Sequence, residues 1–299
     1  MRVWSHADFD FPLPPGHRYP LAKYGLLRDH ALAAGHEVDV PGPIAWESLL
    51  RVHDADFVHR MRTGELGRRE ERVLGLPWSP RLVERARRGT LGTLHAARDA
   101  LRGRRVGMVL GGGTHHAGRA SARGYCLFND LAVVTTELRR ERLARRVLVV
   151  DCDVHQGDGT AELLRGDPDA FCLSVQCERN YPFTRIASDL DVELPARTRD
   201  DDYLAALEGA LAEAHERFGA PDLVLYLAGA DPWEGDGLGR LAMTKAGLRT
   251  RDALVLDHAL ALGAAVAVTL AGGYPPDVGD GVEINAATLA EASARVHSR

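Results

Sequence analysis

The fold is decided by the run Val147-Leu148-Val149-Val150-Asp151-Cys152-Asp153-Val154-His155. Its apolar first half has the length and β-branched character of a buried strand. If the strand continued through the second half, Asp151, Asp153 and His155 would share one face, because strand side chains alternate. Two carboxylates and an imidazole on one buried face require a compensating charge, which a divalent cation supplies.

Apolar runs of strand length recur along the chain, with helical patterns between them. The strand patterns lie at 106–110, 147–150, 171–175, 223–227 and 265–270, and the helical ones at 21–34, 80–102, 131–142, 201–218 and 244–262. This alternation predicts an α/β fold in a single domain, residues 1–299, whose mostly parallel central sheet has helices on both faces. A (β/α)8 barrel is the competing fold, because its site would lie at the equivalent ends of the strands.

Composition excludes several classes of protein. The 299 residues are 45% hydrophobic and 26% charged, as in ordinary globular proteins, which excludes disorder as the main state. A net charge of −5 argues against nucleic-acid binding by bulk charge. None of the four cysteines forms a Cys-x-x-Cys pair, and no apolar run approaches the ~20 residues of a membrane span. Free thiols suit a reducing cytosol, so we expect a cytoplasmic protein.

A second strand end completes a candidate metal site. Asp231 follows the run 223–227 in a turn flanked by glycine and proline. In parallel α/β sheets, ligands bind at the carboxyl ends of the strands. Together with Asp153 and His155, Asp231 would offer two oxygens and one nitrogen. Three protein ligands leave a position open for water, as catalytic zinc sites require.

Acid–base groups follow two further strands. His115 and His116 come after three glycines, where one imidazole could take a proton from water and the other protonate a leaving group. Asp151 and Asp158 could accept the second N–H of these imidazoles and so raise their basicity. Tyr274, after Gly-Gly, could donate a hydrogen bond to a developing oxyanion.

Together these segments resemble the histone deacetylase superfamily. The matching segments are Gly111-Gly112-Gly113-Thr114-His115-His116-Ala117, Gly124-Tyr125-Cys126-Leu127-Phe128-Asn129-Asp130, Asp151-Cys152-Asp153-Val154-His155-Gln156-Gly157-Asp158-Gly159-Thr160, Gly229-Ala230-Asp231-Pro232, Gly237-Leu238-Gly239-Arg240-Leu241 and Gly272-Gly273-Tyr274. The early Arg18-Tyr19-Pro20 and the Asn180-Tyr181-Pro182 loop resemble the class IV branch and its bacterial relatives.

The resemblance implies an arginase/deacetylase-type fold and zinc-dependent hydrolysis of the amide on an acylated amine, such as an acyl-lysine peptide. The implied zinc ligands, one ion per chain, are Asp153, His155 and Asp231. The implied catalytic residues are His115, His116 and Tyr274, with Asp151 and Asp158 behind the histidines. The implied channel residues are Gly124, Tyr125, Gly273 and either Tyr181 or Phe183. A potassium ion is implied near Asp151, Asp153, His155 and Ser174.

Other functions stay open at this point. An acetylpolyamine amidohydrolase or a catalytically silent acyl-lysine binding module would carry many of the same motifs. A ureohydrolase with two manganese ions would need further carboxylates where this chain has Gly157 and Trp233. The arginine-rich stretch 139–146 is interpreted as the solvated end of a helix, with a phosphate or acidic partner as the alternative. Acyl length and oligomeric state are not indicated.

Overall fold

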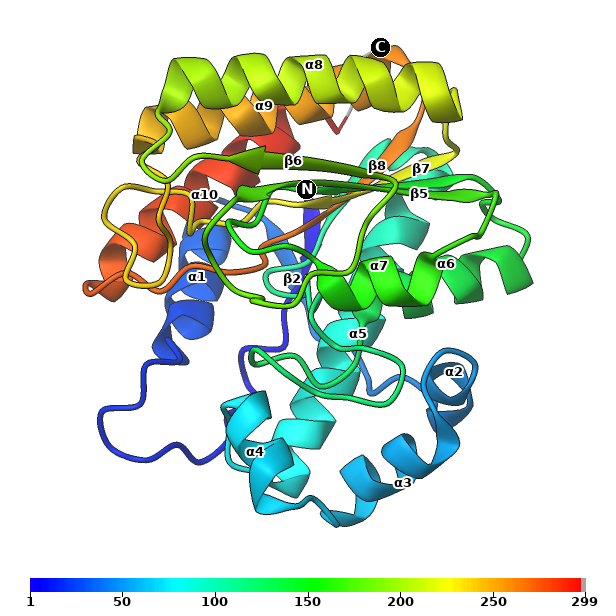
Figure 1. The fold of residues 1–299 in the computed structure, drawn as a ribbon, viewed down its shortest axis with the longest axis vertical. Helices are drawn as coiled ribbons and strands as arrows, with labels where there is room; N and C mark the ends of the chain where they lie inside the picture. Colours follow the sequence, from blue (N-terminus) through cyan, green and yellow to red (C-terminus); the bar gives the residue numbers. More distant parts are fainter. Residues whose placement is uncertain (297–299) are drawn as a thin grey trace.

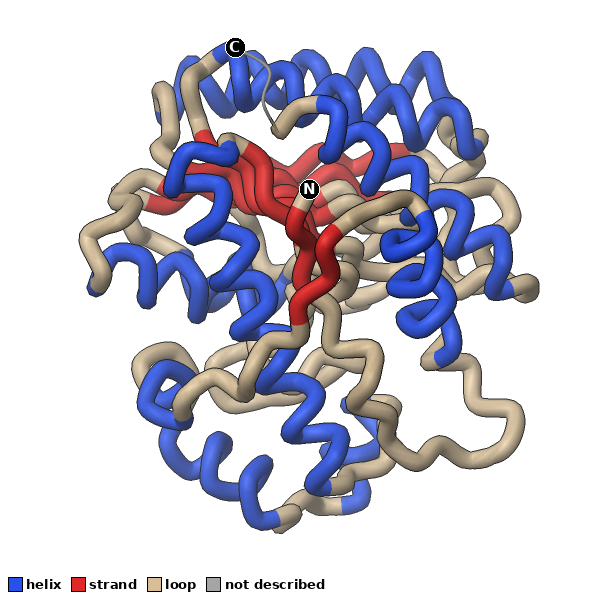
Figure 2. Tube along the Cα trace, turned by 180° about the vertical axis from the view of Figure 1, so that it is seen from behind, coloured by secondary structure: helices blue, strands red, loops and turns tan. Residues whose placement is uncertain are grey.

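A sheet of parallel strands in the order β3-β8-β7-β4-β5-β6 forms the centre of the molecule (Figures 1 and 2). The computed structural model describes residues 1–296, so 297–299 of the expected domain lie outside the described part. The strands are β3 (Val106–Met108), β4 (Val147–Asp151), β5 (Ala170–Cys177), β6 (Leu190–Leu194), β7 (Leu223–Leu227) and β8 (Ala265–Thr269). β1 (Arg2–Trp4) and β2 (Glu37–Asp39) pair separately.

Helices cover both faces of this sheet, which confirms the predicted α/β class. One face packs against α1 (Ala22–Ala33), α8 (Asp200–Phe218), α9 (Lys245–Ala261) and α10 (Val278–Ala294). The other packs against α5 (Pro80–Asp99), α6 (Asp130–Arg140) and α7 (Asp158–Leu164). The short helices α2 (Trp46–Leu50), α3 (Ala55–Thr63) and α4 (Arg68–Leu74) gather near one end of α5 (Figure 1). Within residues 1–296, no helix combines the length and apolarity needed to cross a membrane.

Burial on both faces explains why the central strands were predictable. In β4, Leu148 and Val150 pack into one apolar layer, and Val147 and Val149 into the other. Such a strand reads as a continuous apolar run. The edge strand β6 has the sequence LDVEL and is only partly buried, so its pattern gives no comparable signal.

One predicted helix ends earlier than its pattern indicates. The prediction for 80–102 extends past α5, which ends at Asp99 and passes into a π-helical segment, η1 (Ala100–Arg104). Gly103 within that segment has a φ of 101°, a conformation that interrupts the helix. The chain then enters β3, the strand that leads to the glycine-rich loop.

A fully buried ion pair fastens two strand ends that carry the candidate site. Nη1 of Arg251 on α9 donates to the carbonyls of Gly229, after β7, and Cys152, after β4, at 2.6 and 3.4 Å. Nε and Nη2 of Arg251 donate to Oδ1 of Asp252 at 3.0 and 2.8 Å. The hydroxyl of Tyr226 donates to the same oxygen at 2.5 Å. Because strand order already makes β4 and β7 neighbours, this network fixes how their ends lie.

We therefore expect Arg251→Leu to lower the free energy of unfolding by about 3–5 kcal/mol, because it leaves the buried Asp252 without its cation. Arg249→Leu on the same helix is the matched control. Arg249 pairs with Glu291 at an exposed site, where such pairs contribute at most about 1 kcal/mol. Urea unfolding measures both values, and equal losses in the two variants would contradict the structural role of Arg251.

Candidate active site

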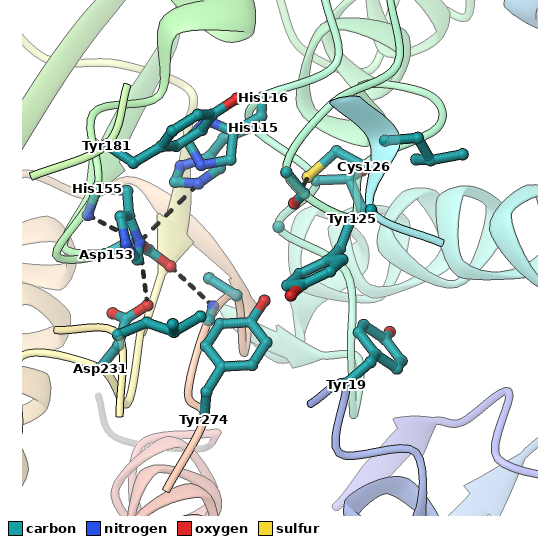
Figure 3. Close-up of a pocket in the computed structure, with 18 of the residues that line it drawn as sticks. Tyr19, His115, His116, Tyr125, Cys126, Asp153, His155, Tyr181, Asp231 and Tyr274 are labelled. Atoms are coloured by element: carbon teal, nitrogen blue, oxygen red, sulfur yellow. Dashed lines mark hydrogen bonds and ion pairs between the residues drawn. The ribbon is translucent and has the colours of Figure 1, made fainter. Parts of the chain in front are cut away.

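A pocket of about 360 Å³ opens at the carboxyl edge of the sheet. Figure 3 shows His, Asp and Tyr side chains from different strand ends surrounding this space. Because β3, β8, β7 and β4 are successive neighbours, segments far apart in the chain meet here. The predicted site residues that line the pocket are His115, His116, Gly124, Tyr125, Asp153, His155, Tyr181, Asp231 and Tyr274.

The candidate metal ligands converge through turns rather than along a strand. β4 ends at Asp151, so the expectation that it continues to His155 is wrong. The N–H of Asp153 donates to Oδ1 of Asp151 at 3.1 Å, and the N–H of His155 to Oδ1 of Asp153 at 2.9 Å. The N–H of Val154 donates to Oδ1 of Asp231 at 2.9 Å. These bonds bend the chain so that the three side chains still face one point.

The chemistry of this group fits a divalent cation. One potential ligand atom from each of Asp153, His155 and Asp231 lies within 4.8 Å of the others, and all three residues are buried. Oδ2 of Asp231 has no hydrogen-bond partner. Burial and the adjacent Asp153 raise the pKa of Asp231 to about 7, which shows how poorly a second negative charge is compensated. Two carboxylates and one imidazole form a set that zinc accepts, with one position left open.

Gly272 lets the backbone after β8 approach these carboxylates. Its N–H donates to Oδ2 of Asp153 at 2.8 Å. A Cβ at this position would lie 2.0 Å from Oδ2 of Asp231, so a side chain is excluded. Gly272 lines the pocket, whereas Gly273, which we expected in the channel, does not; a Cβ on Gly273 would meet Ala230 at 2.8 Å.

Each histidine of the tandem pair faces its own carboxylate. Nδ1 of His115 lies 2.7 Å from Oδ2 of Asp151, and Nδ1 of His116 lies 2.7 Å from Oδ1 of Asp158. With Nδ1–H donated to a carboxylate, Nε2 of each ring is the atom left for proton exchange. The two environments differ, because Nη1 of Arg123 lies 3.0 Å from Asp158 and partly neutralises the negative charge of that carboxylate.

This difference sets the two imidazoles apart in basicity. Burial lowers the pKa of His116 to about 4, since Asp158 only partly offsets the cost of charging the ring. Burial acts on His115 as well, but Asp151 and Asp153 outweigh it and raise the pKa of His115 to about 9. The two imidazoles therefore differ in basicity, with His115 the more basic of the two, a division suited to acid–base work.

Asp130, which was not predicted as a functional residue, anchors the loop that carries the histidines. Its carboxylate at the start of α6 accepts hydrogen bonds from the N–H groups of Gly113 and Thr114, at 2.9 and 2.8 Å, and from the hydroxyl of Thr93 at 2.6 Å. Asp130 is the last residue of segment 124–130, which resembles the deacetylase superfamily. That resemblance could have marked Asp130 as important, but it does not show which groups its carboxylate contacts. The helix N-terminus favours a negative charge at this point.

His53, which was not predicted as a functional residue, also supports this loop. Its Nδ1 donates to the carbonyl of Gly118 at 2.9 Å, and its Nε2 accepts the N–H of Asn129 at 3.1 Å. The side-chain amide of Asn129 donates in turn to the carbonyl of Ala117 at 3.2 Å. A neutral imidazole satisfies both contacts of His53, whereas a protonated one would oppose the N–H of Asn129.

Aromatic rings form the walls of the pocket. The Tyr181 ring meets the His116 ring edge-on, with centroids 4.8 Å apart, and the Tyr125 and Tyr274 centroids are 5.4 Å apart. Phe183, the alternative to Tyr181, is 91% exposed and does not line the pocket. Between the walls, Gly124 has a φ of 55°, and a Cβ there would lie 2.5 Å from Cδ2 of His116.

Two of the residues expected around a monovalent cation come from neighbouring strands. Asp151 of β4 and Ser174 of β5 are register partners in the sheet. Both are buried, and Oγ of Ser174 has no hydrogen-bond partner. The Ser174 hydroxyl and the Asp151 carboxylate therefore offer two buried oxygen atoms that suit a cation.

Comparison with protein families matches the histone deacetylase domain to residues 16–288. An uncharacterized protein of Picosynechococcus sp. is 40% identical over 285 residues, 93% of each chain. Histone deacetylase 2 of Arabidopsis thaliana is 31% identical over 236 residues, which are 76% of this chain and 60% of that protein. This chain therefore spans about 60% of the length of the plant relative.

Two solved structures share the fold. The HD domain of HDA15 has a TM-score of 0.81 at 23% identity, covering 99% of this chain and 93% of that one. An acetylpolyamine aminohydrolase from Burkholderia pseudomallei has a TM-score of 0.77 at 20% identity, covering 98% and 99%. At these identities the likeness concerns the arrangement of the strands and helices.

The His53 contacts predict a pH dependence of stability. Burial lowers the pKa of His53 from its ordinary 6.5 to about 4. Between these two values, His53 binds a proton in the unfolded chain but stays neutral in the folded one. The free energy of unfolding therefore decreases as pH falls. His53 alone contributes a decrease of about 2 kcal/mol between pH 7.5 and pH 5. Urea unfolding should show that His53→Gln removes this part of the pH dependence.

His59→Gln is the control for this measurement, because His59 lies six residues further along the chain, on α3, and its side chain is 61% exposed. We expect it to keep the wild-type pH dependence. A His53→Gln variant whose stability falls with acid as steeply as that of the wild type would contradict the buried neutral state of His53.

Proposed function

This chain belongs to the histone deacetylase domain family, and we propose that it hydrolyses the amide bond of an acylated amine, with an acylated lysine as the substrate. One observation supports this most directly. Asp153, His155 and Asp231 gather within 4.8 Å in a pocket that also presents the His115–His116 pair. The combination provides a metal site, proton-transfer groups and a channel in one place.

We propose zinc as the ion held by Asp153, His155 and Asp231. When bound, it supplies Lewis-acid chemistry, acidifying water and polarising the acyl carbonyl. The donor set and the unpartnered oxygen of Asp231 support this assignment. We also propose a potassium ion beneath it, at Asp151, Asp153, His155 and Ser174, supported by the unpartnered hydroxyl of Ser174.

The histidine pair moves the protons of the reaction. Nε2 of His116 takes a proton from the attacking water, because its Nδ1 is committed to Asp158. The resulting hydroxide adds to the acyl carbon, and the C–N bond then breaks. The departing amine receives its proton from His115, whose charge Asp151 stabilises. The carboxylic acid so formed loses its proton, which restores the protonated His115, and His116 releases the proton taken from water to solvent. The products are therefore a carboxylate and a free amine.

Three tyrosines position the substrate and stabilise charge. Tyr125 and Tyr181 form apolar walls along which the aliphatic part of an acylated side chain fits. Tyr274 lies at the inner side of Tyr125 and offers its hydroxyl to the oxyanion (Figure 3). Burial raises the pKa of Tyr274, which keeps its hydroxyl protonated as a donor.

We further propose that residues 1–299 form one catalytic domain and that the protein works in the cytoplasm. The state of the cysteines supports this location. All four, Cys126, Cys152, Cys172 and Cys177, are free and buried. Free thiols persist where the environment is reducing.

Metal removal and restoration test the proposed function. The metal-depleted protein should lose hydrolysis of acetyl-, decanoyl- and myristoyl-lysine peptides, and one equivalent of zinc should restore it. Hydrolysis that survives chelation would contradict a metal-dependent reaction. Tight binding of acylated peptide by zinc-loaded protein without release of carboxylate would instead identify a silent binding module.

Replacing Tyr274 tests the oxyanion donor. Tyr274→Phe should retain bound zinc but lower kcat by ~10²–10³, the usual effect of removing one such hydrogen-bond donor. Tyr203→Phe is the control, since it removes a buried hydroxyl in α8, outside the pocket. Steady-state kinetics with metal analysis gives both quantities. A Tyr274→Phe enzyme with wild-type kcat would exclude this role.

A further inference from the structure

The entrance of the pocket carries guanidinium groups that no carboxylate neutralises. Arg72 on α4 is exposed and lines the catalytic pocket. Arg18, also exposed, lines an adjoining surface hollow that shares Tyr19, Leu238 and Tyr274 with that pocket. Within residues 1–296, neither arginine takes part in an ion pair. Positive charge therefore faces solvent at the pocket, from Arg72, and at the adjoining hollow, from Arg18.

Two more exposed arginines, Arg179 and Arg240, lie within two residues of the lining residues Asn180 and Leu238. Asn180 and Leu238 are joined by a hydrogen bond of 3.1 Å. Nη1 of the exposed Arg240 donates to the carbonyl of Arg179 at 2.9 Å. The Arg179 guanidinium is 82% exposed and only loosely paired, 3.6 Å from a glutamate.

Of the carboxylates near the entrance, Glu178 lies beside Arg179 and Asp236 is committed to backbone N–H groups. Asp236 accepts the N–H groups of Leu238 and Gly239, both at 2.8 Å, and that of Tyr274 at 2.6 Å. Asp153 and Asp231 lie at the floor of the pocket, in the candidate metal site. Among the described residues that line the pocket and the adjoining hollow, no other carboxylate is present.

We propose that this arginine border selects the substrate: an acylated lysine flanked by acidic residues is favoured, and an acylated polyamine is disfavoured. The proposal rests on the hydrolase function proposed above. A polyamine keeps ammonium groups that would lie in the tyrosine-walled channel or at its entrance, where no free carboxylate receives them. Because the whole chain carries a net charge of −5, the positive entrance is a local feature rather than a bulk one.

The test compares kcat/KM for four acetylated substrates: two peptides of equal length with acidic or basic residues beside the acetyl-lysine, N-acetylspermidine, and an uncharged blocked acetyl-lysine. At low salt we expect the acidic peptide to exceed the basic one by about tenfold, and N-acetylspermidine to be the poorest. The difference should shrink at high salt, because exposed charges are screened.

A charge reversal ties this preference to a residue. Arg72→Glu should lower the ratio of acidic to basic peptide by about threefold to fivefold, as removal of a surface charge interaction does. Arg69→Glu, on the same helix but lining neither hollow, introduces the same charge change and should leave the ratio as in the wild type.

The outcomes separate the two proposals. If the uncharged substrate is hydrolysed but the two peptides react equally, or N-acetylspermidine reacts faster than the acidic peptide, the selection by charge is wrong and the hydrolase function stands. A ratio that changes equally in Arg72→Glu and Arg69→Glu also overturns the proposal. If zinc-loaded protein hydrolyses none of the substrates, the hydrolase function fails and this inference with it.

Discussion

Two carboxylates buried side by side, those of Asp153 and Asp231, are the constraint on which the site depends. The chain compensates for them partly, by donating the N–H of Gly272 to one and the N–H of Val154 to the other. Oδ2 of Asp231 still accepts no hydrogen bond, although it lies 3.4 Å from Nδ1 of His155, and burial keeps the pKa of Asp231 far above its ordinary range. A divalent cation at this point converts an unfavourable cluster of charge into a ligand set.

The rest of the fold serves to hold this cluster. Neighbouring parallel strands deliver their loops to one edge, and buried polar side chains then hold those loops in place. Arg251 binds the carbonyls after β4 and β7, while Asp130 and His53 hold the histidine loop from the opposite layer. Each is a buried polar group whose hydrogen bonds are satisfied, so each restricts the loops to one arrangement.

The sequence predicted the parts whose signal is local. Central strands read as apolar runs because both faces are covered, and the reactive residues followed them directly. The supports were not predictable, because His53 and the carbonyl of Gly118 are 65 residues apart and only the fold joins them. The edge strand β6 lacks a pattern, and Gly272 rather than Gly273 lines the pocket because the turn after β8 sets which backbone faces inward. Asp153 and His155 converge through turns that strand periodicity does not describe.

Unfolding temperatures test most directly whether a cation compensates the two buried carboxylates. They are measured for the wild type and for Asp231→Asn, each without metal and with one equivalent of zinc. Asparagine keeps the oxygen that accepts the N–H of Val154 but removes a buried charge. Zinc should therefore raise the unfolding temperature of the wild type strongly and that of the variant little, and the metal-free variant should melt above the metal-free wild type. If zinc left the unfolding temperature of the wild type unchanged, Asp153, His155 and Asp231 would not be a site for this ion.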